Sequence, residues 1–339
     1  MIISPTRSRQ PRRQPCTLER LLRERATALE HALDRGTTLS YGSHLNSYIA
    51  FCDLHSFPLT PTPDTFSFYI VYMSRHIKPQ SVDSYLSGII HFLRPYFPNV
   101  DSVRHDPLVR QTLKGALRLY GTPVRRKELL EIDHLELCFD RLSTSIAHDD
   151  LLFLALLRVG FHSLLRLGDL VQPDRPELRT LRKVSRRTSV TLHQDYARFV
   201  LQSHKSDRFF EGADIIVKNS VGRGPGPFSA FSKYLTSRDG LFPCHLELWL
   251  RKSGSIPTRA WFTRRLYKLI PDKNVTGHSM RAGGATALAV SGASSSTIQA
   301  IGRWSSETWQ VYIRKHPVLL HAILTADRVR STQQLVHPP

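Results

Sequence analysis

Two segments in the second half of the chain place charged side chains where a hydrophobic core would not select them. Arg166 and Asp169 interrupt the otherwise apolar stretch 160–170. A carboxylate three residues away can hold one side of a guanidinium so that its other donors face an anion, and a simple helical ion pair explains the same spacing. Lys205 lies between two strand-like stretches, where a hairpin turn would point it toward a ligand over the sheet. An ordinary solvated turn lysine is the alternative.

Two later segments add a second pair of cations and two aromatic side chains. His278 and Arg281 are three residues apart at a predicted helix start, so they share a face beside the partial positive charge of the helix N-terminus. Trp304 supplies one indole N–H donor, and Tyr312 supplies a phenol oxygen that becomes a nucleophile once its proton, with a pKa of about 10, is removed. Each of these features is weak evidence alone. Both aromatic residues, for example, are equally well explained as ordinary core residues.

The combination is far more specific than its parts. The segments read L-L-R-L-G-D-L, S-H-K-S-D, H-S-M-R-A-G-G-A-T, G-R-W and V-Y-I-R-K-H-P, in that order along the chain. In order, contexts and spacing they resemble the tyrosine recombinase family over the whole second half, and the final block is most similar to the recombinases of eukaryotic Crypton and DIRS-type mobile elements. The six residues that carry the resemblance are Arg166, Lys205, His278, Arg281, Trp304 and Tyr312.

The resemblance implies a role for each of the six. Arg166 and Arg281 would bind the non-bridging oxygens of one DNA phosphate, because planar guanidinium groups match phosphate geometry. Tyr312 would attack that phosphate, giving a 3′-phosphotyrosyl link and a free 5′-hydroxyl. The other three would move protons or donate hydrogen bonds: Lys205 to the departing 5′-oxygen, His278 at the tyrosine, and Trp304 to the phosphate. No metal or other cofactor is implied, because the covalent link conserves the phosphodiester energy.

The chain departs from the family pattern at two points. Trp304 stands where many members have a second histidine, a replacement that Cre-like recombinases share. Trp304 and Tyr312 are also 8 residues apart, one fewer than is usual in bacterial members, which leaves the helical phase of Tyr312 open.

The composition indicates a polyanionic partner. Lys and Arg number 47 against 28 Asp and Glu, a formal net charge of +19, and such a surplus is typical of nucleic-acid binding, although a merely basic protein shows it too. We expect double-stranded DNA as the partner. The resemblance further implies a homotetramer, or dimer of dimers, assembled on DNA. The basic N-terminus and the eukaryotic resemblance favour the nucleus.

The pattern along the chain predicts a mainly α-helical protein with a small antiparallel β-sheet, an α+β class. We expect a disordered basic arm over 1–16, a helical core-binding domain over 17–122, a basic linker over 123–130 and a catalytic domain with a helical tail over 131–339. Strands are predicted near 189–192, 197–202 and 214–218. Helices are predicted from Leu18 to Gly36, from Thr38, from Asp64, and over 81–93, 107–119, 133–142, 149–165, 258–269, 279–291, 296–301 and 308–315.

Residues outside the six are predicted to contact DNA. One face of the helix over 81–93 is expected to meet a groove, and basic residues of the linker and of the stretch before the sheet are expected to meet phosphates; for that stretch a plain solvated loop is nearly as good an explanation. The predicted contacts are Ser84, Ser87, His91, Arg125, Arg126, Lys127, Arg186 and Arg187.

Three rival functions deserve separate tests. A type IB topoisomerase shares the chemistry, and a domesticated DNA-binding protein could keep the fold without cleaving DNA. A metal-dependent transposase would need three converging carboxylates; Asp149 and Asp150 are the obvious acidic pair, which we interpret as a helix cap.

Overall fold

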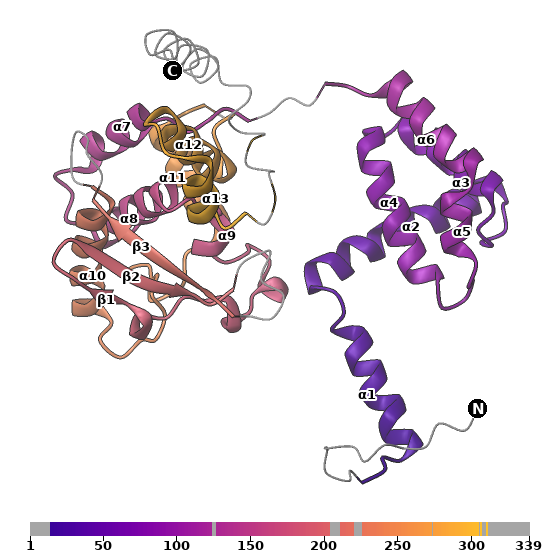
Figure 1. The fold of residues 1–339 in the computed structure, drawn as a ribbon, viewed down its shortest axis with the longest axis horizontal. Coiled ribbons are helices and arrows are strands. Elements are labelled where there is room, and N and C mark those ends of the chain that lie inside the picture. Colours follow the sequence, from indigo (N-terminus) through magenta and orange to yellow (C-terminus); the bar gives the residue numbers. More distant parts are fainter. Residues whose placement is uncertain are drawn as a thin grey trace, which may run out of the picture. The chain divides into compact units, whose positions relative to one another are not determined.

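The computed structural model describes residues 14–123, 127–203, 211–219, 226–272, 274–304, 306 and 310. The chain forms two compact units, 1–124 and 125–339 (Figure 1). The division between them lies within the stretch 123–130. No helix in the described ranges combines the length and the apolar character needed to cross a bilayer.

The described part of the first unit is helical throughout. Tyr48, Phe66, Tyr69 and Ile89 are fully buried and belong to one core, to which the second, third, fourth and sixth helices contribute. Its helices are α1 (Leu18–Glu30), α2 (Arg35–His55), α3 (Pro63–Ser74), α4 (Pro79–Leu93), α5 (Val100–His105) and α6 (Pro107–Tyr120).

Several helix boundaries in this unit differ from the prediction: α2 begins at Arg35 and not at Thr38, and α4 begins at Pro79 and not at residue 81. The first helix ends at Glu30 and not at Gly36, which lies inside the first turn of α2 after the N-cap Asp34. The cap of α3 is Thr62 and not Asp64, because the hydroxyl of Thr62 accepts the backbone N–H of Thr65 while the hydroxyl of Thr65 accepts that of Thr62. The six-residue α5 was not predicted, since it is too short to show a helical period.

The second unit combines helices with a three-stranded antiparallel sheet in the order β1-β2-β3, which confirms the predicted fold class. Along β2, Ala197, Phe199 and Leu201 point into the core, whereas Arg198 is exposed and pairs with Asp214 of β3. The elements are α7 (Ile132–Leu142), α8 (His148–His162), α9 (Leu167–Leu170), β1 (Thr191–Leu192), β2 (Tyr196–Leu201), β3 (Ala213–Lys218), α10 (Pro227–Leu241), α11 (Arg259–Leu269), α12 (Gly277–Val290) and α13 (Ser295–Gly302), with 3₁₀ turns at Pro176–Leu178, Leu181–Lys183 and Arg187–Ser189.

Helix α8 is the central element of the second unit, packing against α7, α9, α10 and α12 (Figure 1). We predicted it to run to Leu165, but it ends at His162. Leu164 adopts a left-handed conformation with φ 50°, and its N–H donates to the Phe161 carbonyl in a tight turn. The break matters because it removes Arg166 from the helix and makes it the N-cap residue of α9.

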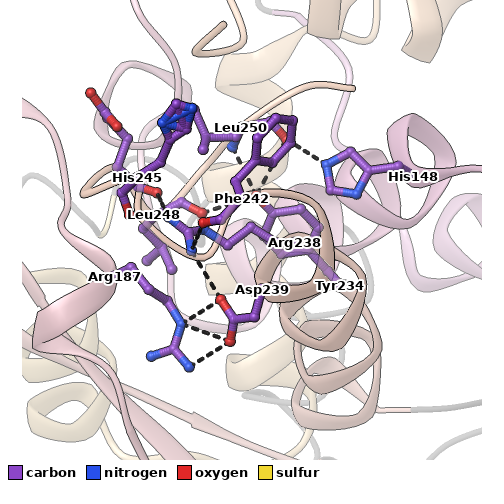
Figure 2. A network of polar contacts seen from close by, with 10 residues as sticks. His148, Arg187, Tyr234, Arg238, Asp239, Phe242, His245, Leu248 and Leu250 are labelled. Atoms are coloured by element: carbon purple, nitrogen blue, oxygen red, sulfur yellow. Dashed lines mark hydrogen bonds and ion pairs between the residues drawn. The ribbon is translucent and has the colours of Figure 1, made fainter. Parts of the chain in front are cut away.

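Helix α10 was not predicted and is organised by a buried arginine, Arg238, which is 1% exposed. Figure 2 shows the polar contacts around it. One terminal nitrogen donates to Asp239 at 3.0 Å and to the Phe242 carbonyl at 2.9 Å, and the other donates to the carbonyls of His245 and Glu247 at 2.5 and 2.8 Å. These bonds fix the loop that follows α10 against the helix.

Candidate functional site

The turn between α8 and α9 presents the first of the predicted arginines. The side chain of Arg166 is half-buried, and its terminal nitrogen Nη1 is buried with no hydrogen-bond partner among the described residues. We predicted that Asp169 holds this guanidinium. That was wrong: an Asp169 carboxylate oxygen accepts the backbone N–H of Arg166 at 2.9 Å and so caps α9. The carboxylate fixes the backbone of Arg166, and its guanidinium keeps an unmet donor.

Arg281 reaches the same turn from α12. Its side chain is 1% exposed; Nη1 donates to the Leu164 carbonyl at 2.8 Å, and Nη2 donates to the Gly302 carbonyl at 2.5 Å. Its guanidinium carbon also lies 4.1 Å from the ring centre of Trp304, which is within the range of a cation–π contact. One buried arginine therefore joins the α8–α9 turn, the end of α13 and Trp304.

Close packing of α12 brings Arg281 to this position. A Cβ added to Gly283 would lie 1.8 Å from the Leu130 carbonyl oxygen, and one added to Gly284 would lie 2.1 Å from the Phe161 carbonyl oxygen. Only glycine allows backbones to approach so closely. The hydroxyl of Thr276 caps the helix by accepting the His278 N–H at 3.3 Å, and the His278 side chain is exposed in the first turn. His278 and Arg281 thus share a helix end, with the histidine toward solvent and the arginine inside.

Trp304 follows the end of α13 and packs against its last turn. A Cβ on Gly302 would lie 1.7 Å from the indole ring, so glycine is required for this placement. The Trp304 carbonyl accepts a hydrogen bond from the Gln299 side chain at 3.1 Å. The structure therefore brings three predicted residues together, Arg166, Arg281 and Trp304, with His278 at the start of the same helix as Arg281.

Arg303 belongs to the same cluster and was not among the predicted site residues. Its Nη2 donates to the Leu164 carbonyl at 3.2 Å, the atom that Arg281 also binds, and its Nη1 donates to the Ile301 carbonyl at 2.9 Å. Burial lowers the pKa of its guanidinium, Asp169 raises it and the neighbouring charge of Arg166 lowers it further. The available signal was an arginine directly after a helix-ending glycine, in the motif G-R-W.

Several predicted residues lie outside the described residues. They include two of the six, Lys205 and Tyr312, and two linker residues, Arg125 and Arg126. Lys205 falls in the connection between β2, which ends at Leu201, and β3, which begins at Ala213. The two flanking strands pair in an antiparallel manner, as we predicted from the sequence on either side.

The predicted DNA contacts of the first unit have mixed surroundings. On α4, Ser84 is exposed, Ser87 accepts a hydrogen bond from Arg104 at 3.0 Å, and half-buried His91 lies 5.5 Å from the Tyr41 ring. All three lie on α4, and none is in the core.

The predicted contacts of the second unit differ from one another. Lys127 and Arg186 are exposed. Arg187 instead binds Asp239 through two nitrogens at 2.8–3.1 Å (Figure 2). Its charge is used within the fold, so we leave it out of the proposed DNA contacts.

The acidic pair at the start of α8 serves structure. Asp149 accepts the Lys252 backbone N–H at 2.7 Å, and Asp150 accepts the hydroxyl of Ser145 at 2.6 Å and a guanidinium nitrogen of Arg265 at 2.5 Å. Within the described part of the chain, no group of three or more His, Cys, Asp or Glu residues is placed to hold a metal ion. Our interpretation of the pair as a helix cap was wrong: the N-cap of α8 is Ala147, without a side-chain cap bond, and the two aspartates lie in the first turn, where they bind other segments.

The arrangement at the α8–α9 turn is suited to binding an anion. The guanidinium groups of Arg281 and Arg303 both bind the Leu164 carbonyl, and Arg166 is an electrostatic neighbour of Arg303. The one carboxylate that also acts on Arg303, that of Asp169, accepts the Arg166 backbone N–H. Buried like charges destabilise the fold unless an opposite charge offsets them. A phosphate group has the charge and the acceptor oxygens that such a cluster would bind.

No protein-family model matches this chain, and no curated protein sequence matches it. Its structure is similar to that of a lambda integrase (75–356) dimer bound to a COC′ core site, with a TM-score of 0.54 at 13% identity over 88% of this chain and 95% of that one. XerH recombinase in a post-cleavage complex with palindromic difH substrate gives 0.54 at 15% identity over 78% and 72%. The Tn1549 transposon integrase in complex with circular intermediate DNA gives 0.53 at 15% over 85% and 92%. The chain therefore has the tyrosine recombinase fold.

Proposed function

We propose that this protein is a site-specific DNA recombinase or transposase of a mobile element, which cuts and rejoins strands through a 3′-phosphotyrosyl intermediate on Tyr312. One observation carries the proposal. Residues far apart in the sequence, Arg166, Arg281 and Trp304, meet at one turn, where a buried guanidinium donor of Arg166 has no hydrogen-bond partner within the described part of the chain. The tyrosine recombinase fold of the chain also supports this proposed function.

In the proposed reaction the arginines hold the scissile phosphate. Arg166 and Arg281 donate to its non-bridging oxygens and offset the negative charge that builds up in the pentavalent transition state. The Tyr312 oxygen attacks phosphorus while the bond to the 5′-oxygen breaks, and Lys205 gives that oxygen a proton. His278 takes the tyrosine proton during cleavage and returns it during religation. Trp304 donates one hydrogen bond and shields the pocket.

The rest of the chain is proposed to bind and assemble the DNA. The first unit would clasp the duplex through the α4 face with Ser84, Ser87 and His91, and the basic stretch around Lys127 would follow the backbone. Four strand cleavages require four active subunits, so we propose a tetramer on DNA, acting in the nucleus. The Crypton and DIRS-type relationship belongs to this proposal.

The test is covalent trapping on nicked suicide duplexes in EDTA. The duplexes are tiled across the DNA on both sides of the coding sequence, and products are separated on a denaturing gel. We expect an adduct with the wild type and with the control Tyr267→Phe, and none with Tyr312→Phe. No adduct with wild-type protein on a duplex that it binds specifically would contradict cleavage and favour a binding-only protein. Relaxation of supercoiled DNA without strand exchange would favour a topoisomerase.

A further inference from the structure

Arg303 has a left-handed backbone conformation, which glycine adopts more easily than arginine. It follows the last residue of α13 with φ 54° and ψ 44°, in the left-handed region. Helices commonly end with glycine in this conformation, because glycine has no Cβ to strain. The chain instead has an arginine there, and its Nε is buried without a hydrogen-bond partner among the described residues. Strain combined with a buried charge is a reason to look for a role beyond ending the helix.

The guanidinium of Arg303 links two segments of the site. Its Nη2 donates to the Leu164 carbonyl at 3.2 Å and lies 3.4 Å from the Ser163 carbonyl, both in the α8–α9 turn. Leu164 is itself left-handed, with φ 50°. Two non-glycine residues in strained conformations are thus held together by a hydrogen bond. The link joins the residue before Trp304 to the turn that presents Arg166.

The charge of Arg303 is a second observation, because it lies in a mostly buried place. Burial lowers the pKa of its guanidinium, Asp169 raises that pKa, and Arg166 lowers it by a smaller amount through like-charge repulsion. A neutral side chain could have donated the hydrogen bond to the Leu164 carbonyl without repulsion from Arg166. A phosphate bound by Arg166 would offset the repulsion, so the charge costs least when the site is occupied.

We infer that Arg303 is a positioning residue of the proposed reaction, which clamps the α8–α9 turn to the end of α13 and so sets Arg166 relative to Trp304. The inference rests on the proposed function. Arg303 acts through the turn and its neighbours and takes no part in proton transfer. Arg303 differs from Arg281 in its backbone. Its left-handed conformation suits glycine, so a change to glycine removes the side chain without straining the chain.

That property gives a sharp test, Arg303→Gly. Glycine relaxes the backbone and removes the like charge, which offsets the loss of the hydrogen bonds to Ile301 and Leu164, so we expect a melting temperature close to that of the wild type. We expect DNA affinity within about twofold, because the arginine contributes little to ground-state binding. The single-turnover rate of adduct formation at saturating DNA should fall about 10–100-fold, the size of effect that a displacement of about 1 Å produces.

The matched control is Arg141→Ala. Arg141 is exposed in the same unit and donates to the Leu269 carbonyl at 2.8 Å, so its loss also removes a charge and an arginine-to-carbonyl bond. We expect its cleavage rate to match the wild type. Arg303→Asn, which also tolerates the left-handed conformation, replaces the glycine variant if α13 frays.

The outcomes separate this inference from the proposed function. If the wild type forms the adduct and Arg303→Gly forms it at the same rate, the inference is overturned and the proposed function stands. If the wild type forms none, the proposed function fails, and hydrogen exchange tests the clamp alone. The Leu164 and Leu165 amides, which donate to Phe161 and Gly160, should then exchange faster in Arg303→Gly than in Arg141→Ala. Equal exchange would overturn the clamp.

Discussion

Two buried arginines in the second unit have the same exposure and different surroundings. Arg238 on α10 and Arg281 on α12 are each 1% exposed. Arg238 binds carbonyls at and just after the end of its own helix, whereas Arg281 binds carbonyls 117 and 21 residues away along the chain. Around Arg238 the charge is compensated: Asp239 lies between it and Arg187 (Figure 2). Around Arg281 the described neighbours include Arg303, which binds the same Leu164 carbonyl, and Arg166, which lies two residues after Leu164 in the chain.

The pKa of the nearby carboxylate expresses this difference. Burial by itself raises the pKa of Asp239, but hydrogen bonds from Arg187 and Arg238 lower it overall. At the other site the Asp169 carboxylate accepts the Arg166 backbone N–H; its charge raises the pKa of Arg303, while the charge of Arg166 lowers it. Burial alone therefore does not distinguish a structural arginine from one that is proposed to bind an anion. We propose that the arrangement of neighbouring charges does.

The largest expected difference between the two arginines is in catalysis. Arg281→Ala should slow adduct formation per folded molecule by about 1,000-fold, or about 4 kcal/mol, because the pentavalent transition state loses a charge-assisted donor. Single-turnover trapping, corrected for the folded fraction by calorimetry, measures this. A normal rate per folded molecule would place Arg281 with the structural arginines and break the comparison.

The complementary change is Arg238→Ala. Removing the side chain leaves the carbonyls of Phe242, His245 and Glu247 without these donors, so the free energy of unfolding should fall by about 3 kcal/mol. Urea denaturation measures the loss. The trapping rate per folded molecule should stay at the wild-type value, and a drop comparable with that of Arg281→Ala would contradict the structural assignment.

The region around the α8–α9 turn should also respond to mild acid. Burial, with the charge of Arg158, lowers the pKa of His162 to about 4, against about 6.5 in the unfolded chain. The unfolded chain therefore takes up a proton first. Stability should be full above pH 6.5 and fall by about 2 kcal/mol between pH 6.5 and 4, allowing for part-exposure of the ring.

His162→Gln should flatten this part of the stability curve, measured by urea denaturation at several pH values. An unchanged slope in the variant would assign the acid sensitivity to other groups. The α10 region should not contribute in this window, since the pKa of Asp239 is lowered below its usual range.

The smallest effect concerns the pair of Arg187 and Asp239, which is partly exposed. A double-mutant cycle with Arg187→Met and Asp239→Asn should give about 1 kcal/mol at pH 7. Because the pKa of Asp239 is lowered, its contribution is present above the unfolded pKa and is lost as pH falls through the folded value, so the cycle should approach zero in strong acid. Arg187→Met should leave DNA affinity unchanged, whereas a clear loss would restore Arg187 as a DNA contact.

The sequence was most informative where the local residue pattern matches the packing that the segment has in the folded chain. The apolar period of α8, the β-branched residues of β2 and β3, and the glycines of α12 predicted elements that the structure contains. The chemistry of Arg281 and Trp304 was also visible as residue types in a known order, and the structure brings these two side chains together.

The features that escaped prediction depend on contacts between distant segments. Nothing local in Leu164 announces a left-handed residue; its carbonyl binds Arg281 and Arg303, which lie more than 100 residues later in the chain. Helix α10 has a buried arginine in place of an apolar residue, which obscures its period. Arg303 was not selected as a site residue, since its contact with the Leu164 carbonyl depends on a turn 139 residues earlier in the chain.

The central claim is that Tyr312 becomes covalently joined to a DNA phosphate held beside Arg166 and Arg281. The most direct measurement is mass spectrometry of the trapped adduct after nuclease and trypsin digestion, with fragmentation of the peptide 304–314. The account predicts a nucleotide 3′-phosphate remnant on Tyr312, at a yield that falls in Arg281→Ala. A remnant on any other residue, or an adduct of equal yield in Tyr312→Phe, would contradict it.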